Sequence, residues 1–154
     1  MFELSLSVDG NKKGSIKLQK FGTEKIPNLK RGIDKATYRL NNTIKKKKLS
    51  GQVLNVRSGL LRASFKTSPA RYEAGVGVYG QVGTNVKYAR IHEYGGVIKP
   101  KPPNQWLRFK TADGSWHTVA EVTMPARPYA VPAMHEETNR MAKDIITEVM
   151  RPLR

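Results

Sequence analysis

The 154-residue sequence lacks cysteine altogether, which excludes disulfide bonds, thiolate metal sites and cysteine nucleophiles. It has no apolar run close to the roughly 18–20 residues that a helix needs to span a bilayer, so we expect no membrane partner. Its three histidines, His92, His117 and His135, include no pair at metal-ligand spacing. The zinc-protease pattern that His92-Glu93 would begin fails because Gly96 stands in place of the second histidine. The sequence therefore predicts neither a metal site nor a cofactor.

Acidic residues are scarce as well: 12 aspartates and glutamates stand against 28 lysines and arginines, for a net charge of +16. The carboxylates are too few and too scattered to form an acid–base pair. The Gly75–Gly83 segment lacks the Gly-Lys-Ser/Thr ending of a phosphate loop. We therefore predict no catalytic residue and no enzyme. The excess of positive charge favours an acidic partner, either nucleic acid or the acidic face of another protein.

Hydrophobic periodicity predicts an α+β fold, with a long basic N-terminal helix and a C-terminal helix packed on an antiparallel β-sheet of roughly four to six strands. Alternating apolar residues predict a strand over Phe2–Val8. Ile16, Leu18 and Phe21 indicate a short second strand. We treat residues 1–154 as a single domain, with residues 1–22 as an N-terminal strand or arm.

The long helix is expected over Thr23–Lys48, with Pro27 in its first turn, where proline is tolerated. Its apolar stripe follows spacings of three and four and comprises Ile26, Leu29, Ile33, Ala36, Leu40 and Ile44. Its opposite face is basic and comprises Lys30, Arg31, Lys35, Arg39 and Lys45 to Lys48. The C-terminal helix, with Pro132 in its first turn, carries a second stripe of Met134, Met141, Ile145 and Val149.

Short elements are expected between the two helices. Residues 63–67 and 72–79 read as strands, the second with glycines that mark a bulge or a close backbone approach. Two short helices are expected at 59–64 and 88–94, the latter stopped by Gly95-Gly96. Asp113-Gly114, flanked by two apolar runs, predicts a protruding β-hairpin. We treat residues 97–124 as an inserted proline-rich loop and hairpin.

Two groups of residues are candidate interface contacts. Lys45, Lys46, Lys47 and Lys48 form either a solvated helix end that suits the helix dipole or a contact to phosphate or to an acidic partner. Trp106 and Trp116 lie on the predicted hairpin beside Arg108. They suit a core, a protein interface or base stacking, and we favour core or interface.

Three segments, taken in order, resemble the tail-completion or head-to-tail joining proteins of long-tailed bacteriophages, which include minor tail protein Z and the virion morphogenesis proteins. Arg57–Ser64 resembles their R-(S/T)-G-x-L-R-x-S segment, with Gly59 as its glycine. Met124–Tyr129 resembles their Pro-Ala-Arg-Pro segment, through Pro125, Arg127 and Pro128. Val82–Gly96 resembles their central segment, and its matching residues include Gly83, Tyr88, His92, Glu93, Tyr94 and Gly95.

These motif residues suit either fold maintenance or contacts between subunits. Gly59 and Gly83 allow tight turns. Tyr88, Ile91 and Tyr94 lie three apart, so we expect them to face one way and to pack on the sheet. Pro125 and Pro128 stiffen the chain before the last helix and hold Arg127 in a fixed direction, where its planar fork can satisfy carbonyls or a carboxylate.

The resemblance implies a structural virion protein of the phage neck, assembled in the host cytoplasm and working by binding. It implies a homo-oligomeric ring, of six copies, between the head connector or adaptor and the tail terminator or tail tube. Such a ring would line or seal the DNA channel and contact packaged DNA. We hypothesise that the 97–124 hairpin reaches a neighbouring protein. The alternative is a free-standing nucleic-acid-binding protein, whose affinity would fall steeply with salt.

Overall fold

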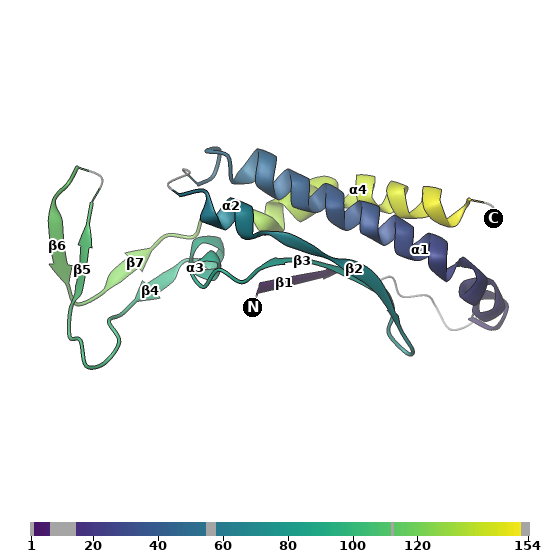
Figure 1. Cartoon of the computed structure of the whole chain (residues 1–154), viewed down its shortest axis with the longest axis horizontal. Helices are drawn as coiled ribbons and strands as arrows, with labels where there is room; N and C mark the ends of the chain where they lie inside the picture. Colours follow the sequence, from purple (N-terminus) through teal and green to yellow (C-terminus); the bar gives the residue numbers. More distant parts are fainter. Residues whose placement is uncertain (1, 7–14, 55–57, 112, 152–154) are drawn as a thin grey trace.

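The computed structural model describes residues 2–6, 15–54, 58–111 and 113–151 (Figure 1). The predicted α+β class is confirmed. Within these residues the helices are α1 (Ser15–Thr43), the π-helical turn η1 (Ile44–Lys48), α2 (Leu60–Ser64), α3 (Ala89–Tyr94) and α4 (Ala130–Val149). The strands are β1 (Phe2–Leu6), β2 (Lys66–Glu73), β3 (Gly77–Thr84), β4 (Gly96–Ile98), β5 (Leu107–Lys110), β6 (Trp116–Val119) and β7 (Val122–Met124).

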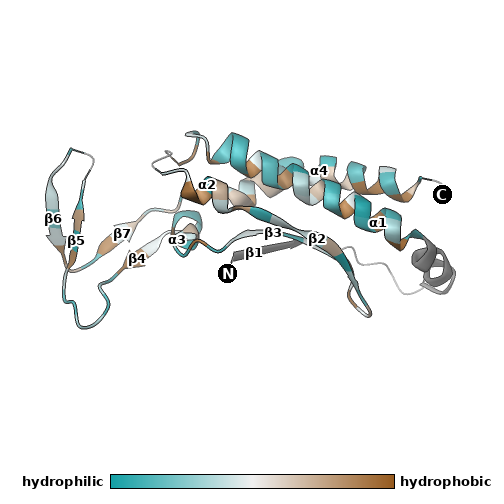
Figure 2. Cartoon of the chain, viewed as in Figure 1, coloured by the Kyte–Doolittle hydropathy of each residue, from teal (hydrophilic) through white to brown (hydrophobic). Residues whose placement is uncertain are grey.

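The two long helices, α1 and α4, lie side by side and antiparallel, and their apolar faces meet (Figures 1 and 2). Both predicted stripes are confirmed, because Ile33, Leu40, Met141 and Ile145 are buried in one core. The helices come close at Gly32, where an added Cβ would lie 2.8 Å from the Cα of Ile145. A larger residue there would push the helices apart.

The main sheet has the order β1-β3-β2, and all its pairings are antiparallel. Strand β3 buries alternate residues, such as Val78 and Val82, beneath α1. Gly80 allows this close packing, because a Cβ at that position would lie 2.7 Å from the side chain of Ile33. The molecule is therefore layered, with α1 between the sheet and α4.

A β-bulge bends strand β2 between Ser68 and Arg71. Pro69, which has no N–H to donate, lies in the bulge. The free amide of Ala70 donates instead to the Asp34 carboxylate of α1, at 2.7 Å. This hydrogen bond thus attaches the sheet to α1 at the position where the β2–β3 hydrogen-bond ladder is interrupted.

Several predicted boundaries were wrong. Helix α1 begins at Ser15, so the second strand predicted at 16–21 belongs to this helix, and Pro27 lies in its interior. Three apolar residues over six positions cannot distinguish a strand from a helix. A long helix packed along its length can also tolerate the one hydrogen bond that proline removes. The predictions that involve residues 7–14 or Arg57 lie outside the described residues.

The predicted strand at 72–79 was also wrong, because it straddles the β2–β3 turn. Gly75 and Gly77 have φ values of +84° and +105°, which explains why glycines stand there. Gly83, predicted to lie in a turn, pairs with Lys66 inside the sheet. Instead of one sheet of about four to six strands, the described strands form one three-stranded and two two-stranded sheets.

Residues 96–111 and 113–124 form an arm that leaves the body beside α3 (Figure 1). At its base, β4 pairs with β7. At its tip, β5 and β6 pair around Asp113-Gly114, so the predicted hairpin is confirmed. No helix in the described part of the chain is both long enough and apolar enough to cross a bilayer.

Candidate assembly interface

The motif segments meet where α3 touches the start of α4. The carboxylate of Glu93 is only 2% exposed and accepts three backbone hydrogen bonds. Tyr129 N and Ala130 N donate to Oε2 at 2.9 and 3.0 Å, and Val131 N donates to Oε1 at 2.9 Å. The next residue, Pro132, has no N–H. Glu93 therefore satisfies the free donors of the first turn of α4 and places a negative charge at the positive end of its dipole.

Tyr129 completes this junction from the other side. Its side chain is fully buried, and its hydroxyl donates to the carbonyl of Ala89 at 3.1 Å. Its ring meets Phe65 edge to face, with centroids 5.8 Å apart. Burial, with a further contribution from the nearby Glu93 carboxylate, raises the pKa of the Tyr129 hydroxyl above its ordinary value, so it remains a hydrogen-bond donor.

Two backbone contacts bring the remaining motif residues together. Arg127 N donates to the carbonyl of His92 at 2.7 Å. Gly95 lies so close to the 124–126 segment that a Cβ would be 2.8 Å from Ala126 N. Beside them, the hydroxyls of Ser64 and Thr84 are 2.5 Å apart, which ties the first segment to the second. All three segments are thus joined in one structural unit, the α3–α4 junction.

Other motif residues depart from prediction. Tyr88 and Tyr94 are 40% and 58% exposed, so the expectation that they pack on the sheet was wrong. The Tyr88 ring instead rests edge to face on His92. Burial and the nearby charge of Arg127 lower the pKa of His92, which favours its neutral form.

Gly59 has a φ of +71° immediately before α2, as expected of a tight turn. Pro125 and Pro128 are exposed beside Arg127.

The tip of the arm presents two different faces. The strand register places Leu107, Phe109, His117 and Val119 on one face, and Arg108, Lys110, Trp116 and Thr118 on the other. On the first face, Phe109 stacks on His117. On the second, the guanidinium of Arg108 lies 4.8 Å from the Trp116 ring centroid. Trp106 and Trp116 are 59% and 61% exposed, so their assignment as core residues is excluded.

The basic face runs from α1 into η1, and four of its eight residues pair with carboxylates of α4: Lys35, Arg39, Lys47 and Lys48. Lys47 lies 3.7 Å from the buried Glu137 carboxylate, and Lys48 pairs with Glu136. Arg39 donates two hydrogen bonds to Asp144, at 2.6 and 3.2 Å. The acidic groups that the sequence predicts as partners of these lysines and arginines are therefore supplied, in part, by α4 of the same chain. The pairing residues on α4 could have been found from their positions, because Glu137, Asp144 and Glu148 recur at helical spacing.

We expect Asp144→Asn to make stability less sensitive to acid. The hydrogen bond from Arg39, followed by the charges of Arg39 and Lys35, lowers the pKa of Asp144. A lowered pKa adds stability above the unfolded value of about 4, and this stability is lost as pH falls through the folded pKa. Urea unfolding at pH 7 and pH 3 should show a smaller difference for the variant than for the wild type. An equal difference would mean that the pair contributes no net stability.

Comparisons with known proteins agree with this arrangement. The model of the phage virion morphogenesis family matches residues 35–151. The matched region contains α4, the α3–α4 junction, the arm, η1 and the C-terminal part of α1 from Lys35. Searches of curated proteins and of solved structures find no significant match. Since the family model covers most of the sequence, including every segment of the junction, the chain belongs to the phage virion morphogenesis family.

Proposed function

We propose that the protein is a neck component of a tailed phage, a tail-completion protein that forms a ring between the head connector and the tail. Family membership supports a structural role in the virion. The arm supports the finer assignment, because it has the features of a surface that a partner covers. In this role the protein works by binding, and it aligns and seals the DNA channel.

The arm is the single observation that carries this proposal. A two-stranded hairpin is at best marginally stable in water unless another layer covers it. Here the hairpin leaves Phe109 37% exposed and both tryptophans more than half exposed. Val97 and Ile98, at its base, are also exposed. Aromatic residues beside arginine are the usual centre of a protein interface. We therefore propose that the arm contacts a neighbouring protein of the neck.

The charge of the chain bears on the identity of that neighbour. Each copy of the chain has a net charge of +16. The basic arm would therefore be repelled by most surfaces of a second copy, except where acidic residues are exposed. Apart from Asp113 and Glu121, the arm's charged residues are basic: Lys99, Lys101, Arg108 and Lys110. We therefore propose that its tip meets an acidic surface of the connector, adaptor or tail terminator. Contacts between copies in the ring would use other surfaces, joined head to tail.

The double variant Trp106→Ala/Trp116→Ala is expected to assemble poorly while remaining folded. Both side chains are mostly exposed in the single chain, so we expect a loss in unfolding free energy of less than about 1 kcal/mol. Loss of two interface tryptophans typically weakens binding by more than about 2 kcal/mol each. Complementation of a phage that lacks this gene should give few tailed particles by negative-stain electron microscopy.

A matched control is Tyr72→Ala, which removes a half-exposed aromatic from β2, outside the arm. This variant should support a normal titre. Normal tailed particles with the double tryptophan variant, or with residues 99–120 deleted, would exclude the arm as an essential contact. Cryo-electron microscopy of purified particles tests the location directly. Density for this chain in a ring at the head–tail junction is expected, and its absence from mature particles would contradict the proposal.

A further inference from the structure

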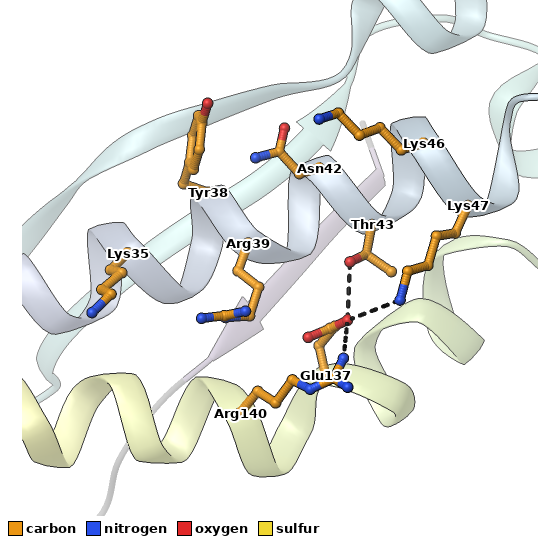
Figure 3. A pocket seen from close by; sticks show the side chains of 9 residues that line it. All are labelled: Lys35, Tyr38, Arg39, Asn42, Thr43, Lys46, Lys47, Glu137 and Arg140. Carbon is orange, nitrogen blue, oxygen red and sulfur yellow. Dashed lines mark hydrogen bonds and ion pairs between the residues drawn. The ribbon is translucent and has the colours of Figure 1, made fainter.

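A groove runs between α4 and the C-terminal part of α1 with η1 (Figure 3). Its volume is about 440 Å³, and it is open to solvent along its length. All of its lining side chains carry a polar group, and none is aliphatic: Lys35, Tyr38, Arg39, Asn42, Thr43, Lys46, Lys47, Glu137 and Arg140. Five of the nine are cationic and one is anionic. Basic and hydrogen-bonding groups therefore lie along the groove, on the carbon stems of the same side chains.

The one carboxylate that lines the groove, that of Glu137, lies beneath its cations. Glu137 is 2% exposed, and its Oε1 accepts hydrogen bonds from Thr43 at 3.1 Å and from Arg140 at 3.2 Å. Arg140 and Lys47, which pair with it, are 62% and 57% exposed. The surface that solvent meets is thus positive. The buried Glu137 carboxylate also holds the side chains of Arg140 and Lys47 in place, which reduces the entropy that they would lose on binding an anion.

A second row of donors follows the outer edge of the groove. Tyr38, Asn42 and Lys46 are spaced four apart, so they form one ridge of α1 and η1. Figure 3 shows all three pointing away from α4. Within the described chain, none of these three side chains forms a hydrogen bond or an ion pair. The ridge spans about 12 Å at 1.5 Å per residue, which is the rise of about three to four nucleotide steps along the duplex axis at roughly 3.4 Å each.

We propose that this groove and its ridge bind the phosphate backbone of double-stranded DNA without reading the base sequence. Lysine, arginine, asparagine and tyrosine side chains are the groups that commonly donate to DNA phosphates. Lys46 supplies the unpaired charge, while Tyr38 and Asn42 supply neutral donors beside it. The biological setting, DNA that passes through a neck ring, rests on the proposed function, but binding by the isolated chain does not.

The composition of the groove favours DNA over an acidic protein. Protein interfaces place apolar or aromatic anchors in a dry centre. This groove offers donors along an open line and no aliphatic residue. The groove has one aromatic residue, Tyr38, whereas the arm has two exposed tryptophans and the partly exposed Phe109. The two surfaces are therefore assigned to two kinds of partner.

Lys46→Glu tests the groove with little risk to the fold, because the Lys46 side chain is exposed and forms no hydrogen bond or ion pair within the described residues. The probe is a fluorescein-labelled 20-base-pair duplex of mixed sequence, and binding is followed by anisotropy from 50 to 200 mM salt. We expect Lys46→Glu to weaken binding about tenfold and to lower the salt slope by about one unit or more. Tyr38→Phe, which removes only a hydroxyl, should weaken binding a few-fold, on the order of one neutral hydrogen bond.

Lys87→Glu is the matched control, because it makes the same charge change at an exposed lysine outside the groove. We expect its affinity to stay within about twofold of the wild type. Equal losses for Lys46→Glu and Lys87→Glu would overturn the proposal, since net charge alone would then explain binding. Wild-type binding that polyglutamate abolishes as readily as unlabelled duplex of equal charge would overturn it in favour of an acidic protein.

The test separates this inference from the neck assignment. If Lys46→Glu binds DNA as the wild type does while the chain is found in the neck, the groove assignment fails and the proposed function stands. If the chain is absent from particles while Lys46→Glu still weakens binding selectively, the groove stands and the neck role fails. Thermal melting by circular dichroism should show that Lys46→Glu, Tyr38→Phe and Lys87→Glu are folded.

Discussion

Replacing Glu93 by alanine is expected to lower the free energy of unfolding by about 4 kcal/mol. The substitution leaves three amides without an acceptor: those of Tyr129 and Ala130, which are buried, and that of Val131, which is partly buried. Each unsatisfied buried amide costs about 1–3 kcal/mol, less what water recovers. Loss of an ordinary helix cap costs about 0.5–2 kcal/mol, and this cap serves three donors and carries a charge. Urea unfolding followed by circular dichroism measures the difference.

Two further variants show whether the effect belongs to the cap. Glu121→Ala removes a carboxylate that lies half exposed beside Lys99 on the arm. Exposed ion pairs contribute little, so we expect a change within about 0.5 kcal/mol. Glu93→Gln keeps one acceptor oxygen but loses the charge, and should cost roughly half as much as alanine. If Glu93→Ala is no worse than Glu121→Ala, the carboxylate does not hold α4.

The features that sequence predicted well are set by local chemistry. The stripe of α1 follows from the spacing of Ile33, Ala36 and Leu40, which are buried as expected. The hairpin follows from Asp113-Gly114, because few other residue pairs suit so tight a turn. In both cases neighbouring residues carry the signal. No contact with a distant part of the chain is needed to infer the element.

The features that sequence missed depend on residues far apart in the chain. Glu93 caps a helix that starts 37 residues later, whereas ordinary helix caps are local. In the sequence, Gly32 and Gly80 look like ordinary glycines inside a helix and a strand. The structure shows that each is packed closely, Gly32 against Ile145 and Gly80 against Ile33. The start of α1 was misplaced because Pro27 was taken as an N-terminal signal. Such close contacts leave no periodic trace in sequence.

The motif residues divide between the two roles that sequence alone left open. Glu93, Gly95 and Tyr129 lie in the α3–α4 junction and maintain the fold. Tyr94 and Arg127 are exposed beside the base of the arm, where subunit contacts remain a proposal. The junction also fixes where the arm leaves the body. A residue that maintains the fold here can therefore affect assembly through the position of the arm.

Gly95→Ala is expected to affect both fold stability and the position of the arm. We expect it to lower the free energy of unfolding by about 4 kcal/mol. Gly95 has φ +70° and ψ −173°, a backbone region that is essentially restricted to glycine and costs other residues about 1–3 kcal/mol. A Cβ would also lie 2.8 Å from Ala126 N and 2.9 Å from the carbonyl oxygen of Met124. Both are backbone atoms, which can yield only if β7 moves away, and such overpacking costs about 1–3 kcal/mol more.

Gly51→Ala separates the strain from the clash. Gly51 also has a positive φ, +106°, but a Cβ there would meet nothing within 4 Å. We expect this control to lose only about 1–2 kcal/mol from backbone strain and to complement the phage normally. Gly95→Ala should lose more stability in urea and, even below its unfolding temperature, give fewer tailed particles, because β4 and β7 can no longer leave the body in the same direction. Equal losses for the two variants, with normal particles from both, would show that the contact between Gly95 and Ala126 does not position the arm.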